Sequence, residues 1–234
     1  MQIVIGIGVL LLAYIIGSIP FGLLIVKLKT GKDIRTVESG RTGGTNAMRV
    51  AGLGVGLLTV FMDILKSAST VWLAQAFLPD AHLLHALAPI MAIIGHNYSI
   101  FLPERNEQGK VVRLRGGAGG ASSVGGAFGL WGPSILIIVP LGALVFFTVG
   151  IASITTMSVA FFAIIIFAVR AWLGLTPWVY VLYGVLAEIL LIWALRPNLK
   201  SLFAGNERIV RQSLHGWIKA KREKQEPHPG NNVA

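Results

Sequence analysis

The chain has 234 residues and a mean hydropathy of +0.73; 54% of its residues are hydrophobic and only 13% are charged. A soluble domain carries about 25% charged residues, so this composition excludes an ordinary soluble domain and indicates a protein embedded in lipid. The absence of cysteine excludes disulfides, thiolate metal sites and thiol nucleophiles. The net charge of +10 lies in short loops and a tail, which favours anionic lipid and phosphorylated substrates over nucleic acid as partners.

Long apolar segments predict an all-α integral membrane fold with about seven transmembrane helices. The predicted spans lie near residues 3–26, 54–77, 83–102, 117–131, 134–150, 154–171 and 177–195. The segment 117–131 is short and glycine-rich, so a re-entrant segment is the alternative to a span there. The first segment has neither a basic leader nor a small-residue cleavage site, so we expect it to be a retained span.

The charges of the loops predict the orientation in the membrane. Lys and Arg residues follow the first and third predicted spans, whereas the connections near Asp80, Gly132 and Leu173 contain none. The positive-inside rule then places the N-terminus outside and the C-terminus in the cytosol. We expect residues 1–207 to form one membrane domain and residues 208–234 to form a basic cytosolic tail, whose end from Glu226 has the composition of a disordered segment.

The first basic loop combines glycines, hydroxyls, an amide and two arginines between Ser39 and Arg49. Glycine lets backbone N–H groups turn toward an anion, and the arginine guanidinium fits phosphate oxygens. The loop is therefore a candidate phosphate site, with an ordinary solvated loop as the alternative. No Walker-type Gly-Lys-Ser/Thr order is present.

Two further stretches contain candidate anion ligands. Arg115, Gly116, Gly117 and Gly119 lead directly into an apolar segment, which would place the positive end of a helix dipole at the membrane surface. Close helix packing by small residues is the alternative explanation of these glycines. The stretch from Arg196 to Glu207, taken alone, is typical of a juxtamembrane amphipathic segment.

Four polar residues within the predicted spans need a structural or functional explanation. Asp63 and Lys66 are three residues apart and would share a helix face, so we expect them to pair with each other. Glu188 would need a partner across the bundle that the sequence does not name. His96 lies near the cytosolic end of its span, where a hydrogen-bonded structural role and a role as a base are both open.

Taken in order, these stretches resemble the bacterial acylphosphate:glycerol-3-phosphate acyltransferases, the PlsY family of seven-span membrane enzymes. The resemblance extends over nearly the whole chain. The matching pieces are Gly17-Ser18-Ile19-Pro20-Phe21-Gly22, Ser39-Gly40 through Asn46 with Arg49, Met62-Asp63-Ile64-Leu65-Lys66, Gly95-His96, Gly116-Gly117, and Asn198 with Gly205-Asn206-Glu207.

The resemblance implies transfer of a fatty acyl group from acyl phosphate to the 1-position of glycerol 3-phosphate, giving lysophosphatidic acid and phosphate. It implies no metal, nucleotide or other cofactor, and a bacterial inner-membrane enzyme whose active face is cytosolic. We assign four catalytic candidates, which are Ser39, Arg49, His96 and Asn198. His96 is expected to shape the site, since family enzymes use the substrate phosphate for proton transfer. The substrate-binding candidates are Gly40, Arg41, Thr45, Asn46, Arg115, Gly116, Gly117, Gly119, Ser153 and Glu207.

The chain departs from the pattern of this family at three positions. In the first motif, the loop from Ser39 to Arg49, Arg41 stands where the family has asparagine. In the second motif, which begins at Gly116-Gly117, Ala118 stands where the family has lysine. In the last motif, which contains Asn198 and Glu207, Leu195 stands where the family has histidine. We hypothesise that Arg41, together with Arg115, replaces the missing lysine charge. The alternative is a non-catalytic or altered-specificity relative that acts as a membrane transporter or binding protein for a phosphorylated ligand, although the chain shows no internal repeat of the kind common in transporters.

Overall fold

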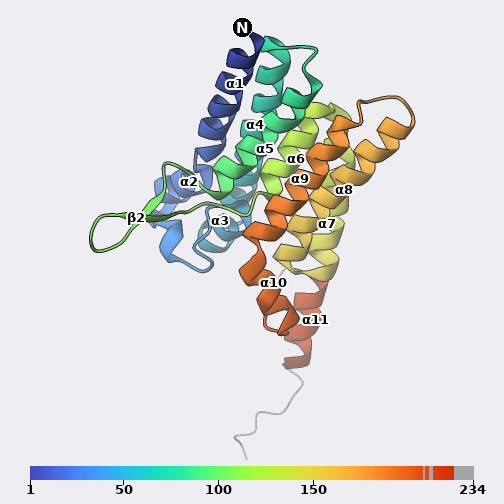
Figure 1. Cartoon of the computed structure of the whole chain (residues 1–234). Helices are drawn as coiled ribbons and strands as arrows, with labels where there is room; N and C mark the ends of the chain where they lie inside the picture. The colour runs from blue at the N-terminus through green and yellow to red at the C-terminus, as the bar shows by residue number, and fades with distance from the viewer. Residues whose placement is uncertain (208, 211–212, 224–234) are drawn as a thin grey trace, which may run out of the picture.

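The computed structural model describes residues 1–207, 209–210 and 213–223 and shows a helical bundle with a small hairpin at one side (Figure 1). The helices are α1 (Gln2–Ser18), α2 (Phe21–Thr30), α3 (Gly44–Ala51), α4 (Leu53–Phe77), α5 (His82–Asn97), α6 (Gly120–Leu130), α7 (Ile135–Val149), α8 (Ala152–Trp172), α9 (Val179–Ala194), α10 (Arg196–Phe203) and α11 (Leu214–Glu223). Short 3₁₀ turns occupy Ile34–Thr36 and Gly132–Ser134, and the strands are β1 (Pro103–Arg105) and β2 (Val111–Leu114).

Four helical segments of the described chain are long and apolar enough to cross a membrane. They are Gln2–Thr30, Leu53–Phe77, Gly132–Val149 and Ala152–Trp172. A fifth is α9 if it is counted together with α10, to which it is joined at a bend of 67°. The expectation of an all-helical membrane bundle is therefore confirmed for its main spans.

The two remaining predicted spans form shorter helices, so the count of seven stays a prediction. Helix α6 has 11 residues and rises only about 16 Å, against the roughly 30 Å of a hydrocarbon core. Helix α5 ends at Asn97, so the prediction that this helix extends to residue 102 is wrong. The chain turns there because the Ser99 N–H donates to Arg115 O and the Arg115 N–H donates to Leu102 O, which joins residues 99–102 to the base of the hairpin.

The hairpin departs from the all-α expectation. Strands β1 and β2 pair antiparallel across a turn in which Asn106 Oδ1 accepts the N–H groups of Gln108 and Lys110. Gly109 has a φ of 77°, which glycine adopts without strain. An asparagine and a glycine at these turn positions thus fold a basic loop into a hairpin.

The first span is broken at Ile19 and Pro20, between α1 and α2. Proline has no N–H group to continue a helix, so nearby carbonyl groups lose their helical partners. Side chains from other parts of the chain donate to them: Ser99 Oγ, just after α5, donates to Ser18 O, and Lys66 Nζ on α4 donates to Ile19 O at 2.9 Å, beside the Phe21 N–H. The break is thereby tied to α4 and to the end of α5.

Glycines allow close contact between helices on the inside of the bundle. An added Cβ at Gly17 would lie 2.2 Å from Ala92 O on α5, and one at Gly125 would lie 2.2 Å from Ile64 O on α4. The apolar core beside these contacts includes Ile93, Phe167 and Tyr183, all fully buried. Small residues at such crossings are the usual way in which membrane helices approach each other closely.

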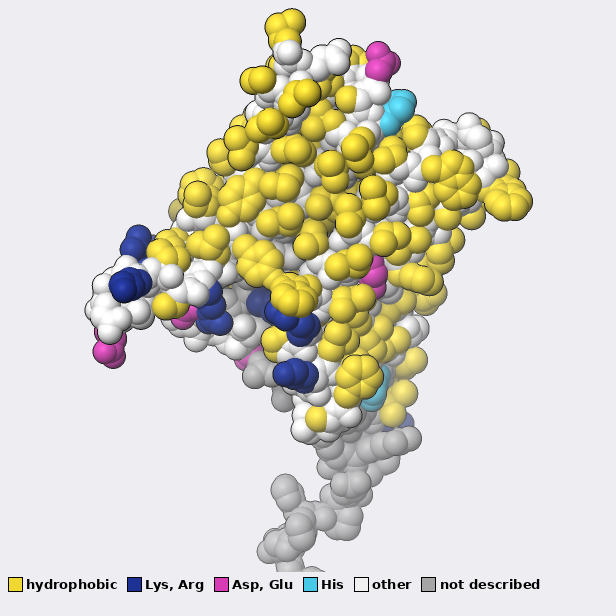
Figure 2. Space-filling view, in the orientation of Figure 1, with side chains coloured by type: hydrophobic (Ala, Val, Ile, Leu, Met, Phe, Trp, Pro, Cys, Tyr) yellow, Lys and Arg dark blue, Asp and Glu magenta, His cyan; other side chains and the backbone are white. Residues whose placement is uncertain are grey.

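The outer surface separates apolar from basic side chains. Hydrophobic side chains cover most of the bundle in Figure 2, whereas Lys and Arg gather at its lower end, near the hairpin and near α10. The N-terminus lies at the opposite end of the bundle from α10 and α11 (Figure 1). The tail from Glu226, with its predicted disorder, lies outside the described residues.

Replacing Gly125 with alanine should destabilise the fold, because the new methyl group overlaps the backbone of α4. Overpacking of this kind costs about 1–3 kcal/mol. Gly8→Ala on α1 is the matched control, since a Cβ there meets nothing within 4 Å. In thermal unfolding followed by size-exclusion chromatography in detergent, G125A should lower the midpoint and G8A should not; equal midpoints would contradict this account of the packing.

Candidate functional site

A cavity of about 1020 Å³ opens at the end of the bundle where the basic loops gather. Four helices begin at its wall, since the first residues of α3, α6, α8 and α10 all line it. Helix N-termini present unpaired backbone N–H groups and carry a positive partial charge. Arginine side chains add full charges to the same wall, and they are Arg41, Arg49, Arg113, Arg115 and Arg196. The cavity is therefore suited to an anionic ligand.

The first basic loop forms one wall of this cavity and is held from inside by Asn46. The buried Asn46 amide donates from Nδ2 to the carbonyl oxygens of Ile34, Val37 and Arg41, at 3.3, 3.2 and 2.9 Å. Asn46 thus organises the loop, while its Oδ1 has no hydrogen-bond partner in the described structure. Ser39 is exposed at the rim, and its Oγ accepts the N–H of Arg41.

The glycine-rich second loop lies against the first loop and the end of α5. The Thr42 N–H donates to Gly116 O, and the Gly117 N–H donates to His96 O at 2.9 Å. A Cβ at Gly117 would lie 2.0 Å from His96 Nε2, and one at Gly116 would lie 2.2 Å from His96 O. Only glycine therefore fits at these two positions, because any side chain would displace the loop from α5.

Arg115 joins the same two loops from their outer side. Its Nη2 donates to Arg35 O at 3.1 Å and would lie 2.6 Å from a Cβ on Gly40. Gly40 has a φ of 65°, a second reason for glycine at this position. The Arg115 guanidinium thus both lines the cavity and holds the loop that carries Ser39.

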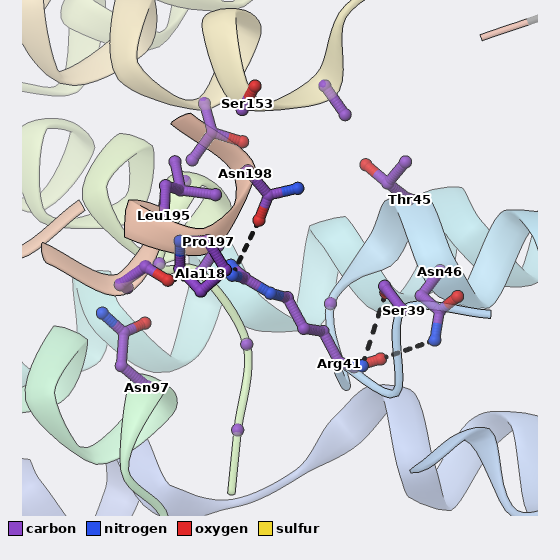
Figure 3. Close-up of a pocket in the computed structure, with 18 of the residues that line it drawn as sticks. Ser39, Arg41, Thr45, Asn46, Asn97, Ala118, Ser153, Leu195, Pro197 and Asn198 are labelled. Atoms are coloured by element: carbon purple, nitrogen blue, oxygen red, sulfur yellow. Dashed lines mark hydrogen bonds between the residues drawn. The ribbon is translucent and has the colours of Figure 1, made fainter. Parts of the chain in front are cut away.

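Arg41 crosses the cavity from the first loop to the last motif (Figure 3). Its Nη2 donates to Ala194 O and to Asn198 Oδ1, both at 2.8 Å, and Asn198 Nδ2 donates to Glu207 Oε1 at 2.8 Å. Burial lowers the pKa of the Arg41 guanidinium, and the nearby Glu207 carboxylate opposes this shift. Its Nη1 is buried without a hydrogen-bond partner in the described structure.

Other unpaired polar groups lie in the same wall. Asn97 is 4% exposed, and neither its Nδ2 nor its Oδ1 has a partner among the described residues. Ser153, 2% exposed at the start of α8, has an unpaired Oγ within the same part of the chain. Buried polar groups in proteins are nearly always hydrogen-bonded, so donors left free around one cavity indicate the place of a polar ligand.

A charged cluster inside the membrane-spanning region reaches the cavity wall through Asp63 and His96. Lys66 Nζ is 2.8 Å from Asp63 Oδ1 and 3.0 Å from His96 Nδ1, and all three side chains are at least 95% buried. The predicted Asp63–Lys66 pair is confirmed. Because His96 also holds Gly117, the cluster connects the broken first helix to the second loop.

Comparison with known proteins agrees with this geometry. A sequence profile described as glycerol-3-phosphate acyltransferase matches residues 7–205. A glycerol-3-phosphate acyltransferase of Thermus thermophilus is 37% identical over 199 residues, which cover 85% of this chain and 92% of that protein. Glycerol-3-phosphate acyltransferase 2 of Moorella thermoacetica is 36% identical and covers 85% of this chain and 94% of its own length.

The chain belongs to the glycerol-3-phosphate acyltransferase family. Its fold agrees with that assignment: the crystal structure of PlsY (YgiH), an integral membrane glycerol 3-phosphate acyltransferase in its glycerol 3-phosphate form, superposes with a TM-score of 0.74. That match has 25% sequence identity and covers 87% of this chain and 94% of the other. The present family member is thus a multi-pass membrane protein.

In this acyltransferase, every residue that the sequence nominated for the site lines the same cavity. They are Ser39, Gly40, Arg41, Thr45, Asn46, Arg49, His96, Arg115, Gly116, Gly117, Gly119, Ser153, Asn198 and Glu207. The contacts of these residues with substrate stay predictions. The structure does show which of them are already bonded within the protein. Asn46, Asn198 and the second-loop glycines make contacts within the protein, whereas Arg41 Nη1 and Ser153 Oγ have no hydrogen-bond partner among the described residues.

Sequence reasoning missed Asn97 and gave no partner for Glu188. Asn97 follows Gly95 and His96 directly, so its position at the end of a span beside a named motif was the available signal. Glu188 is partly buried, and its Oε2 has no hydrogen-bond partner in the described part of the chain. The cross-bundle partner expected for Glu188 is therefore not found among those residues.

Replacing Asp63 with asparagine should strongly destabilise this family member, because Lys66 would remain buried without its counter-ion. Breaking a buried ion pair from one side typically costs about 3–5 kcal/mol. The matched control is Glu104→Gln, which breaks the exposed Glu104–Arg113 pair of the hairpin and should leave the unfolding midpoint unchanged. If thermal unfolding in detergent gave the two variants the same midpoint, the structural role of the buried cluster would be refuted.

Proposed function

We propose that this chain transfers a fatty acyl group from acyl phosphate to the 1-hydroxyl of glycerol 3-phosphate, which releases lysophosphatidic acid and phosphate. The observation that carries the proposal is the convergence of four helix N-termini, several arginines and unpaired buried donors on one cavity at the end of a membrane bundle. Both substrates are phosphate esters or anhydrides, and one of them carries an acyl chain. A site with this charge at the edge of a membrane can hold both.

The reaction mainly requires that the two substrates be positioned and that the charge on their phosphates be stabilised. The 1-hydroxyl oxygen of glycerol 3-phosphate attacks the acyl carbonyl carbon, the bond from that carbon to the phosphate oxygen breaks, and phosphate leaves with the electron pair. The hydroxyl proton passes to a substrate phosphate. Acyl phosphate is already activated and its leaving group is a stable anion, so arginine donors and helix N-termini aimed at the two phosphates can supply much of the catalysis.

Within this proposal, the candidate residues divide into binding and positioning groups. Ser39, Thr45 and Arg49 are proposed as ligands of substrate from the first loop, and Ser153 from the start of α8. Asn46 and Asn198 are proposed to hold the first loop, and His96 is proposed to hold the second. The support is the hydrogen bonds of the Asn46 and Asn198 side chains with Arg41, and that of the His96 carbonyl with the Gly117 N–H.

We further propose seven crossings, with the N-terminus outside and the active face in the cytosol of a bacterial inner membrane. The positions of the N-terminus and of α10 at opposite ends of the bundle support an odd number of crossings. The basic loops at the α10 end support its cytosolic side. On this topology the fourth crossing includes α6, whose 11 residues are fewer than a full span needs, and the N-terminus of α6 opens onto the cavity.

The alternative that the chain is a transporter depends partly on charged residues within the membrane that could bind a ligand. Asp63 and Lys66, which it would use as intramembrane ligands, form a pair with each other. Glu188 lies outside the residues that line the cavity. We therefore keep the acyltransferase as the function of the site.

Purified protein in detergent or lipid should release phosphate from palmitoyl phosphate only when glycerol 3-phosphate is present, and lysophosphatidic acid should form in equal amount. The control without glycerol 3-phosphate measures unaided hydrolysis. Mass spectrometry of the lipid product checks the stoichiometry. No release above that control would overturn the proposed function.

Arg41 is proposed to supply the charge that the family pattern assigns to a lysine in the second motif. Ala118 lines the same cavity but has no charge, while Arg41 brings its unpaired Nη1 to that cavity from the opposite loop. Arginine suits this position because one nitrogen can hold Asn198 while another faces a phosphate.

Arg41→Asn should therefore lower kcat/KM for acyl transfer roughly 100-fold or more, the usual effect of removing a donor that stabilises developing charge. Adding Ala118→Lys to this variant should restore a large part of the loss, because it returns the cation to the second loop. Arg105→Gln, on the exposed hairpin, is the control and should keep normal kinetics. Normal kinetics in R41N would refute the compensation.

A further inference from the structure

Helix α11 carries an exposed apolar stripe outside the bundle. Leu214, Trp217 and Ile218 are 55%, 59% and 38% exposed, and Lys221 follows on the same face. Their spacing of three, four and seven residues puts them on one side of a helix. Residues after 205, and with them this stripe, lie outside the segment that matches the family profile.

The segment before α11 is docked firmly on the turn between α7 and α8. Ile209 forms a β-bridge with Ile151, and the Val210 N–H donates to Gly150 O at 2.7 Å. Ser213 is buried and packs directly against Gly150, where an added Cβ would lie 2.0 Å from the Ser213 Oγ. These contacts set the direction of α11, so its apolar stripe faces outward because of the fold and not because the helix is free.

The stripe continues the lipid-facing surface of the neighbouring helices. Leu144 and Phe147, in the last two turns of α7, are 59% and 54% exposed on the outside of the bundle, and α11 packs against α7. Phe203, at the end of α10, is 86% exposed. Helices α10 and α11 lie at the same end of the bundle (Figure 1). Aromatic and aliphatic side chains in this arrangement are typical of the boundary between headgroups and acyl chains.

The charge of this part of the chain indicates the sign of the surface it meets. From Arg208 to the last residue the sequence contains six Lys or Arg and two Glu. Lys221 Nζ lies 5.4 Å from the centre of the Trp217 ring, which places one cation directly beside the stripe. Basic residues close to an anionic leaflet strengthen binding to it.

We propose that α11 lies in the headgroup region of an anionic phospholipid leaflet, with Leu214, Trp217 and Ile218 inserted below the headgroups and Lys221 among the phosphates. A charged face with an apolar stripe of this kind binds the interface without spanning the bilayer. The helix thereby anchors the segment that follows Glu207 to the membrane, on the side where the cavity opens.

A fluorescent label at Leu214 tests the position of α11 directly, since the chain has no native cysteine. The Leu214→Cys variant carries an environment-sensitive NBD label and is reconstituted, one chain per nanodisc, in phosphatidylcholine with or without phosphatidylglycerol. Glu107→Cys, on the exposed turn of the hairpin, is the matched water-facing control. We expect blue-shifted emission from the Leu214 label, and stronger quenching by headgroup spin labels than by an aqueous nickel chelate.

Lys221→Glu should reduce the blue shift in phosphatidylglycerol discs and leave it unchanged in pure phosphatidylcholine. Emission from the Leu214 label equal to that of the Glu107 label would overturn the proposal. A blue shift that required two chains per disc would also overturn it, because the stripe would then cover a second copy of the chain. Neither result bears on acyl transfer, so this test is independent of the proposed function.

Discussion

The architecture of the site depends on the side chain of Lys66. Where the first span breaks at Pro20, backbone carbonyl groups inside the membrane lose their helical partners, and lipid offers no water to replace them. The Lys66 ammonium satisfies Ile19 O while it pairs with Asp63 and contacts His96. His96 in turn holds the second loop through Gly117. One buried cation thus joins three helices and places a loop against the cavity.

The cavity follows from this arrangement of broken and short helices. A continuous transmembrane helix places both of its ends in water or headgroups, but α3, α6, α8 and α10 all begin at one place. Their N-termini leave backbone donors there, and the arginines add charge that does not depend on the backbone. The unpaired groups of Asn97, Ser153 and Arg41 complete a wall that offers donors on several sides. Such a wall suits an anionic ligand.

The sequence predicted the parts of the molecule that depend on local pattern. Hydropathy located the long spans because lipid requires apolar residues over a whole helix, and glycine beside arginine located both loops of the site. The hairpin, the end of α5 at Asn97 and the inward role of Asn46 were not predictable in this way. The end of α5 depends on backbone hydrogen bonds to a separate segment, such as that of the Ser99 N–H to Arg115 O, and Asn46 binds carbonyl groups that only the folded first loop brings together. The contact of Arg41 with Asn198 joins residues 157 positions apart, and no local pattern encodes it.

In the proposed compensation, Arg41 moves a charge from the second loop to the first. A lysine ammonium on the second loop would be a single point donor near the phosphates, whereas the guanidinium on the first loop has separate nitrogens on a planar group. One nitrogen makes the hydrogen bonds to Ala194 and Asn198 that hold the last motif, and the other remains available. The proposed exchange would therefore link ligand binding to the contact between Arg41 and Asn198. Glu207 lies at the end of this chain of hydrogen bonds, next to the segment that leads to α11. The charge on the cavity wall and the attachment of the tail thus meet at one carboxylate.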